Sequence, residues 1–187
     1  MLKNLDTRTE IIQIGDSLIR ERGYNAFSFS DISKHLHIKN ASVHYHFPTK
    51  TALGVAIIQE HIGRLEQLKN KTANKSPLEK LKAFLSIYST AKSENKVCIV
   101  GSMATDLYTV DPEIQDELKK LANNILKWIT EILQEGKSNG VFHFIINERT
   151  KALLIITNML ASVQLTRLTN KQDFQQIKKS IIEDLIQ

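Results

Sequence analysis

Residues 27–53 read FSFSDISKHLHIKNASVHYHFPTKTAL and carry the strongest structural signal in the chain. They predict two short helices joined by a tight turn, with a further helix directly after them. The second short helix would present short polar, aromatic and cationic side chains on one surface, which suits a DNA major groove better than a core or a catalytic pocket. The residues of this surface are Lys39, Asn40, Ser42, His44, Tyr45 and His46.

The residues before this stretch predict an amphipathic helix. Thr7 and Glu10 have the spacing of a capping box, and Gly23 is suited to end the helix in a left-handed conformation. After a short link, Ser30 would cap a second helix over residues 31–36. The N-terminal part is therefore expected to be helical.

Residues that begin or end helices also predict the turn and the third helix. Residues 37–39 would form the turn and residues 40–47 the third helix, which Pro48 would stop. Thr49 would then cap a long fourth helix over about residues 50–70. Two helices joined by a three-residue turn describe a helix-turn-helix, whose second helix lies in the major groove.

The remainder of the chain also reads as helices. After a polar linker at 70–76, further helices are expected from Pro77, over residues 98–107, from Pro112 to Gly136 or Gly140, over residues 148–168 after an Asn147 cap, and from Asp173. The segment VFHFII at 141–146 is strand-like in composition, but it has no partner strand and is expected to be a buried loop. These patterns predict an all-α protein of about nine helices.

Composition limits the class of protein. A chain of 187 residues can bury a core, and 42% hydrophobic residues with three prolines argue against disorder. The single cysteine, Cys98, excludes an internal disulfide and fits a reducing cytoplasm. No apolar run is long enough to span a membrane, and the N-terminus lacks the pattern of a signal peptide. We expect a soluble cytoplasmic protein with no membrane partner.

The net charge of +5 is unevenly distributed along the chain. Residues 61–92 contain seven Lys and Arg against two Asp and Glu, whereas residues 1–60 contain seven against six. The positive excess therefore follows the predicted DNA-binding segment. It can add long-range attraction to a polyanion, but a solvated helix face explains it better.

The predicted recognition helix supplies two kinds of DNA contact. Asparagine suits adenine, lysine suits guanine, and small or apolar groups suit the thymine methyl group. The candidates for reading base edges are Lys39, Asn40, Ala41, Ser42 and Tyr45. The candidates for phosphate contacts are His44, His46 and Lys50, with Ser28 and Thr49 as hydroxyl donors to the DNA backbone.

These motifs resemble the tetracycline-repressor (TetR/AcrR-type) family of bacterial transcription regulators. The matching residues are Asp31-Ile32, Ile38, Ser42, the run from His46 to Lys50, and Ala52-Leu53. The resemblance is strongest over residues 8–60, where SVHYHFPTK is a specific signal, and it extends to CIVGSMATDLYTVDPEI at 98–114.

Two residues depart from the family pattern. His37 stands where the turn usually has glycine, so a histidine must adopt an unusual backbone conformation at a cost of about 1 kcal/mol. His44 stands where tyrosine is common, which retains a phosphate contact but could make it sensitive to pH.

The resemblance implies a DNA-binding domain at 1–53, built of three helices with a helix-turn-helix, and a helical ligand-binding and dimerisation domain at 54–187. A homodimer would bind a palindromic double-stranded DNA operator and release it when a small-molecule effector binds; most members of the family are repressors. The helix at 148–168 is apolar on more than one face, which independently suits pairing with a second subunit.

The expected ligand and dimer residues lie in the second domain, and for each ligand candidate core packing is the favoured alternative role. The ligand candidates are His61, Tyr88, Met103, Trp128 and Phe142. The dimer candidates are Leu153, Ile156, Leu160, Val163, Ile177, Ile181 and Leu185.

Other classes of function fit less well. His35, His37, His44 and His46 are paired two residues apart, which does not place a pair on one helical face, so neither a metal nor another cofactor is expected. Cys98 has no resolving cysteine and fits a structural thiol better than an oxidant sensor. A helical enzyme lacks an evident nucleophile–base pair, and an interaction protein with a vestigial DNA-binding domain is the other alternative.

Overall fold

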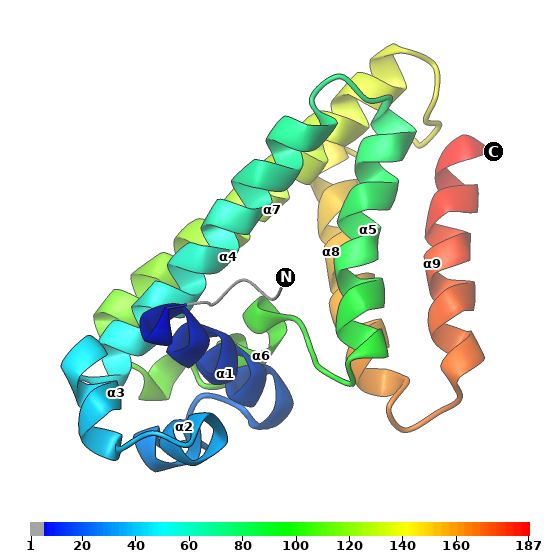
Figure 1. The fold of residues 1–187 in the computed structure, drawn as a ribbon. Helices are drawn as coiled ribbons and strands as arrows, with labels where there is room; N and C mark the ends of the chain where they lie inside the picture. Colours follow the sequence, from blue (N-terminus) through cyan, green and yellow to red (C-terminus); the bar gives the residue numbers. More distant parts are fainter. Residues whose placement is uncertain (1–5) are drawn as a thin grey trace, which may run out of the picture. The chain divides into compact units, whose positions relative to one another are not determined.

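A computed structural model describes residues 6–187, with only the backbone described for residue 171. Within this range the chain is all α-helical, as expected, with nine α-helices and one short 3-10 helix (Figure 1). None of these helices is both long and apolar enough to cross a membrane. The elements are α1 (Thr7–Arg22), α2 (Phe29–Leu36), α3 (Asn40–His46), α4 (Lys50–Thr72), α5 (Pro77–Ser93), α6 (Ile99–Thr105), η1 (Leu107–Thr109), α7 (Pro112–Ser138), α8 (Glu148–Leu165) and α9 (Lys171–Ile186).

The chain divides into two compact units. The first contains the described residues up to Gly63 together with Ile99–Leu121, and the second contains Arg64–Cys98 and Ala122–Gln187. Helices α4 and α7 each contribute residues to both units. These units are defined by contacts and not by function, so the predicted boundary between a DNA-binding and a ligand-binding domain after residue 53 stays a prediction.

In the first unit, α1, α2 and α3 pack against one another, and α6 packs against α1 (Figure 1). Ile11, Ile19, Ile32, Val43 and Leu53 are completely buried between these elements and α4. Since α2 and α3 are too short to be stable as isolated helices, this shared core holds them in place.

In the second unit, α8 packs against both α5 and α9. Figure 1 shows these three helices together. Its largest fully buried side chains are Phe84, Tyr88, Phe142 and Phe174. Aromatic rings bury more apolar surface than most aliphatic side chains, so these four residues dominate the core of this unit.

Two N-terminal caps differ from their predicted positions. Asp6, and not Thr7, caps α1, because its carboxylate accepts a hydrogen bond from the Thr9 amide at 2.7 Å. Helix α2 starts earlier than predicted because Ser28, and not Ser30, forms a capping box with Asp31. Several oxygen-bearing side chains lie near both helix starts, and the sequence alone does not distinguish them.

The later boundaries also differ in places. Helix α3 ends at His46, α8 ends at Leu165, and α7 continues through Gly136. Helix α9 begins before Asp173 because the Asn170 side chain accepts hydrogen bonds from the first amides of the helix.

The loop at 141–146 is only partly buried, so the prediction for it is wrong in part. Phe142 is buried, whereas the side chain of Ile145 is fully exposed. The loop is tied to the end of α9 by a hydrogen bond of 2.7 Å from the His143 amide to the Leu185 carbonyl.

Gly136 generates a prediction about packing in the second unit. A Cβ atom built on it would lie 2.0 Å from Cδ2 of Phe142, so the α7 backbone approaches this ring directly. We expect Gly136→Ala to lower the free energy of unfolding by about 1–3 kcal/mol, because the ring has to move in a packed core. Chemical denaturation at fixed protomer concentration measures this change.

Gly63→Ala is the matched control, because Gly63 also lies within a helix but nothing lies within 4 Å of an added Cβ atom. The better helix propensity of alanine should stabilise this variant by up to about 1 kcal/mol. Equal stabilisation by both substitutions would contradict the packing of Phe142.

Candidate nucleic-acid interface

Helices α2 and α3 form a helix-turn-helix around an unusual backbone conformation. His37 has φ 54° and ψ 38°, in the left-handed region, as expected from a histidine at this position of the turn. The Ile38 amide then donates a hydrogen bond of 3.0 Å to the Ser33 carbonyl, which closes the end of α2. This geometry turns the chain sharply into α3.

One side of α3 is anchored in the core and the other faces solvent. Val43 is completely buried, and Phe47, directly after the helix, is 3% exposed. Tyr45 is 84% exposed, which is unusual for a large aromatic side chain and typical of a contact surface. Of the other predicted base-reading residues, Lys39, Asn40 and Ala41 are exposed and Ser42 is half-buried.

A hollow of about 380 Å³ lies between α3 and the first turn of α1. It brings together four predicted DNA-binding residues with two that the sequence did not indicate. The hollow is lined by Thr7, Ile38, Ala41, Ser42, Tyr45 and His46. Thr7 was missed because it lies more than thirty residues before α3 in the chain, and only the packing of α1 on α3 brings it there.

The aromatic and cationic side chains around α3 contact one another. The His44 ring lies edge-on to Phe29, with a centroid distance of 4.8 Å, and Tyr45 is edge-on to His46 at 5.2 Å. The Arg8 guanidinium lies 5.0 Å from the centroid of the Phe47 ring. Arg8 is exposed, so it is a further cation beside α3 that the sequence did not indicate.

Lys50, at the start of α4, is engaged within the first unit. Its Nζ atom donates a hydrogen bond of 2.6 Å to the Phe27 carbonyl and lies 4.7 and 4.3 Å from the ring centroids of Tyr24 and Phe27. Thr49 caps α4 as expected, because its Oγ1 atom accepts a hydrogen bond from the Ala52 amide at 3.0 Å. Both residues therefore stabilise the N-terminal end of α4.

Ser28, before α2, also has a partner within the first unit, and the surroundings of Lys50 shift its pKa. The Ser28 hydroxyl lies 2.7 Å from an oxygen of Asp31 in the capping box of α2. Burial lowers the pKa of the Lys50 ammonium, although the carboxylates of Asp106 and Asp31 oppose this shift. The predicted DNA contacts of Ser28, Thr49 and Lys50 would thus be made by side chains that also stabilise the fold.

The histidines of this region do not form a cluster with cysteine or carboxylate side chains. Within residues 6–187, no group of three or more His, Cys, Asp or Glu side chains is arranged to hold a metal ion. The His35 Nδ1 atom instead lies 2.8 Å from the Asp31 carbonyl oxygen of its own helix.

The predicted ligand residues belong to different compact units. His61 and Met103 lie in the first unit, where the His61 Nε2 atom is 2.6 Å from Asp16 Oδ1 and Met103 is completely buried. Asp16 is also paired with Arg20 at 3.2 Å. Burial raises the pKa of Asp16, but the hydrogen bonds and charges of His61 and Arg20 together outweigh it, so the net pKa is lowered.

The other three ligand candidates lie in the second unit. Tyr88 and Trp128 are both edge-on to Phe84, with centroid distances of 5.4 and 6.3 Å, so the structure brings these two candidates into one aromatic cluster. Burial, and then the neighbouring Cys98 thiol, raise the pKa of Tyr88 well above its usual value. Phe142 instead packs against Gly136.

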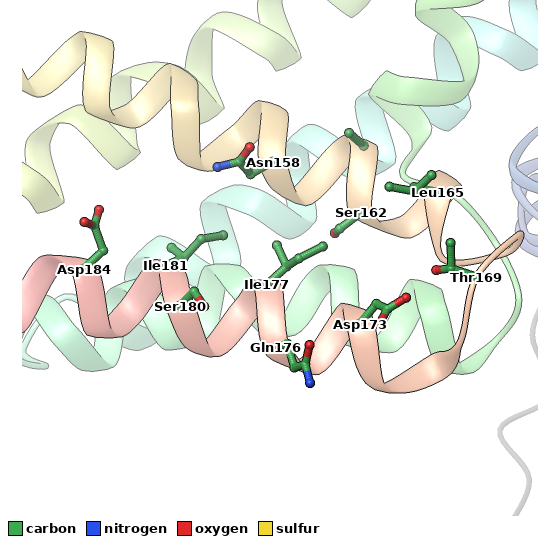
Figure 2. A pocket seen from close by; sticks show the side chains of 11 residues that line it. Asn158, Ser162, Leu165, Thr169, Asp173, Gln176, Ile177, Ser180, Ile181 and Asp184 are labelled. Atoms are coloured by element: carbon green, nitrogen blue, oxygen red, sulfur yellow. The ribbon is translucent and has the colours of Figure 1, made fainter.

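A second hollow, of about 830 Å³, runs between α8 and α9 (Figure 2). Figure 2 shows that α8 contributes Asn158, Ser162 and Leu165, and that Ile177 and Ile181 project from α9. The full lining is Asn158, Ala161, Ser162, Leu165, Thr169, Asp173, Gln176, Ile177, Ser180, Ile181 and Asp184.

The predicted dimer residues are only partly exposed along these two helices. Val163 and Leu185 are buried inside the protomer, and Ile156 and Leu160 are half-buried. Leu153 is 42% exposed. Leu154 and Leu165 were not among the predicted residues, yet they are exposed to 47% and 54%. Apolar periodicity identified the helix but not which of its apolar residues face solvent.

Comparison with known proteins gives two family matches along the chain. Residues 11–57 match the family described as bacterial regulatory proteins, tetR family. Residues 97–187 match the C-terminal region of QacR-like proteins. The first match contains the helix-turn-helix, and the second contains α6 to α9.

Individual relatives agree with these matches. The chain is 24% identical to the HTH-type transcriptional repressor DhaR of Mycobacterium sp. (strain GP1), over 71% of this chain and 68% of DhaR. It is 19% identical to the repressor NemR of Escherichia coli (strain K12), over 74% of this chain and 73% of NemR. A solved TetR transcriptional regulator from Legionella pneumophila is 32% identical with a TM-score of 0.87, over 98% of this chain and all of that one. The chain belongs to the TetR family of bacterial regulatory proteins.

Proposed function

We propose that the protein is a cytoplasmic transcriptional repressor that binds a palindromic DNA operator as a homodimer and releases it when a small-molecule effector binds. The observation that carries the proposal is the solvent-facing side of α3, where Tyr45 is 84% exposed beside Lys39 and Asn40. Membership of the TetR family supports a regulatory role, and the names of DhaR and NemR support repression over activation. The regulatory role described for the family and for these relatives favours this function over a helical enzyme.

In this proposal α3 lies in the major groove. Asn40 is suited to adenine and Lys39 to guanine, while Ala41 can contact a thymine methyl group. Ser42 and Tyr45 complete the base-reading set. These contacts would provide the sequence selectivity.

Phosphate contacts would come from the edges of the same surface. His44 and His46 remain the predicted contacts, and Arg8 joins them because its exposed guanidinium is held beside α3 by the Phe47 ring. A guanidinium binds phosphate in a bidentate way, and stacking on a ring reduces the entropy lost on binding.

Lys50 has two possible contributions to DNA binding. It was predicted to contact a phosphate, and this stays a prediction. Its hydrogen bond to the Phe27 carbonyl supports a positioning role, because it joins the link before α2 to the helix that follows α3. Losing the ammonium would leave a carbonyl and two ring faces without this partner.

For the homodimer, we infer that the partner subunit packs on the groove between α8 and α9. Exposed Leu154 and Leu165 give this face an apolar part, and Ala161 and Ser180 are small enough for helices to approach closely. Since a two-fold interface uses the same patch on both subunits, the groove would be filled by the equivalent α8 and α9.

For the effector, the aromatic cluster of Tyr88, Phe84 and Trp128 supports a site in the second unit. The cluster offers ring faces and one buried hydroxyl, a combination that suits an apolar ligand with a single polar group. His61, Met103 and Phe142 stay candidates from the sequence.

The first test is fluorescence anisotropy with the DNA upstream of the protein's own gene, beside random DNA, across a salt series. We expect selective binding, because base contacts distinguish the two DNAs while phosphate contacts do not. The proposed homodimer should bind with two protomers per site. Asn40→Ala should relax selectivity at one base pair, where about 1–3 kcal/mol of discrimination is lost. A set of operators with single base-pair changes measures this loss.

Lys39→Met, in contrast, should change selectivity at a different base pair of the same set. Binding that declines equally on operator and random DNA as salt rises would contradict sequence-specific regulation at this site. An equal loss on both DNAs for Asn40→Ala would contradict its assignment to a base.

The positioning role of Lys50 predicts a change in stability without DNA. Lys50→Met should lower the free energy of unfolding by about 1–2 kcal/mol, because one hydrogen bond and two cation–π contacts are lost. Lys39→Met is the control. It should change the free energy of unfolding by no more than about 0.5 kcal/mol, since the Lys39 side chain makes no capping hydrogen bond. Unchanged stability of Lys50→Met would leave only the phosphate contact.

The dimer face predicts that Ala161→Arg weakens self-association at least about tenfold, because like charges meet across the two-fold axis. Analytical ultracentrifugation over a concentration series measures the dissociation constant. Gln134→Arg adds the same charge on an exposed position of α7 and should leave association unchanged. Dimers of equal strength in both variants would exclude this face.

A further inference from the structure

The segment Ser102–Asp111 makes hydrogen bonds to the chain on either side of the helix-turn-helix. It comprises the end of α6, the 3-10 helix η1 and the residues before α7, and it lies in the same compact unit as α1 to α3. Its first contact is a buried hydrogen bond of 2.6 Å from the Ser102 hydroxyl to the Ile19 carbonyl in the last turn of α1.

The second contact is made at the turn between α1 and α2. One carboxylate oxygen of Asp106 accepts hydrogen bonds from the Tyr24 amide at 2.8 Å and the Asn25 amide at 3.4 Å. Gly23, with φ 97°, allows the backbone to present both amides to this oxygen, and a Cβ atom there would lie 3.3 Å from it. The Asn25 side chain also donates to the Thr109 hydroxyl at 2.7 Å.

The third contact is made at the start of α4, which follows α3 in the sequence. The Thr51 hydroxyl, in the first turn of α4, donates a hydrogen bond to the Asp111 carboxylate. One short segment therefore contacts the chain just before α2 and just after α3. The two recognition helices lie between these anchors in the sequence.

This arrangement is costly for a protein that approaches phosphates. Asp106 and Asp111 place two carboxylates against the elements that carry the DNA-facing surface, where negative charge opposes association with DNA. Polar anchors at both ends of α2 and α3 can offset this cost by fixing the orientation of the two helices. Helices of 8 and 7 residues have little stability of their own and take their orientation from such contacts.

We propose that Asp106 is a positioning residue for operator binding: it fixes the α1–α2 turn and thereby the orientation of α3. The inference deepens the proposed function and rests on it. Without the carboxylate, the turn samples several arrangements, and only the fraction that presents α3 correctly binds the operator. Apparent operator affinity falls in proportion to that fraction.

The test compares Asp106→Ala and Asp106→Asn with a control of equal charge change, Asp116→Ala. Asp116 is exposed on α7 and is paired with Lys119 of its own helix. Binding to the operator and to random DNA is measured by anisotropy for each variant, beside thermal unfolding and the number of protomers bound per operator.

We expect Asp106→Ala to weaken operator binding about tenfold while binding to random DNA is unchanged or slightly tighter. Removal of a negative charge by itself strengthens both, so charge does not explain a selective loss. Asp106→Asn keeps an oxygen that accepts the two amide hydrogen bonds and should remain within about threefold of the unmodified protein. Asp116→Ala should show no selective loss.

The outcomes separate the two proposals. If the unmodified protein does not distinguish operator from random DNA, the proposed function fails. If it does, and Asp106→Ala binds the operator as tightly as Asp116→Ala, the positioning role of Asp106 is wrong. A merely structural role would lower the melting temperature and the bound fraction without changing the ratio of operator to random affinity.

Asn25→Ala covers the case in which Asp106→Ala does not fold. This exposed side chain contributes one hydrogen bond of the same anchor, to Thr109. Its removal should weaken operator binding about two- to threefold with random binding unchanged. Unchanged operator binding in this variant overturns the proposal.

Discussion

The orientation of α3 depends on contacts outside it, because a helix of 7 residues cannot define its own position. Val43 and Phe47 anchor one side of it in the core shared with α1 and α4. Hydrogen bonds then hold the chain at both ends of the helix-turn-helix, at Asp106 and at Lys50. These contacts determine which way the solvent-facing side of α3, including the exposed Tyr45, is directed.

Several polar side chains near the interface contribute to the fold as well as to the proposed contacts with DNA. Ser28 caps α2, Thr49 caps α4, and Lys50 binds the Phe27 carbonyl. The exposed hydroxyl groups of Ser28 and Thr49 can exchange such partners for phosphate oxygens at small net cost, since each hydrogen bond contributes only about 1 kcal/mol in water. If these residues contact DNA as proposed, DNA binding and the stability of the first unit are coupled through them.

The second unit distributes its apolar residues between a core and an exposed face. Tyr88 and Trp128 are part of the core, which makes them available to an effector only if the ligand becomes part of that packing. Leu165 in the lining of the groove between α8 and α9, and Leu154 elsewhere on α8, remain exposed, and in the proposed dimer a second subunit would cover them. The same helix, α8, thus serves the core on one side and the proposed interface on the other.

The sequence by itself determined the helical class, most helix positions, the left-handed turn at His37 and the set of residues on α3, because these depend on local spacing, capping and side-chain type. It did not distinguish neighbouring caps such as Ser28 and Ser30, which compete within one turn. Only the tertiary structure decided that Arg8 and Thr7 lie beside α3, that Val163 and Leu185 are buried, and that Asp106 holds the α1–α2 turn. These facts depend on contacts between residues far apart in the chain, which no local pattern encodes.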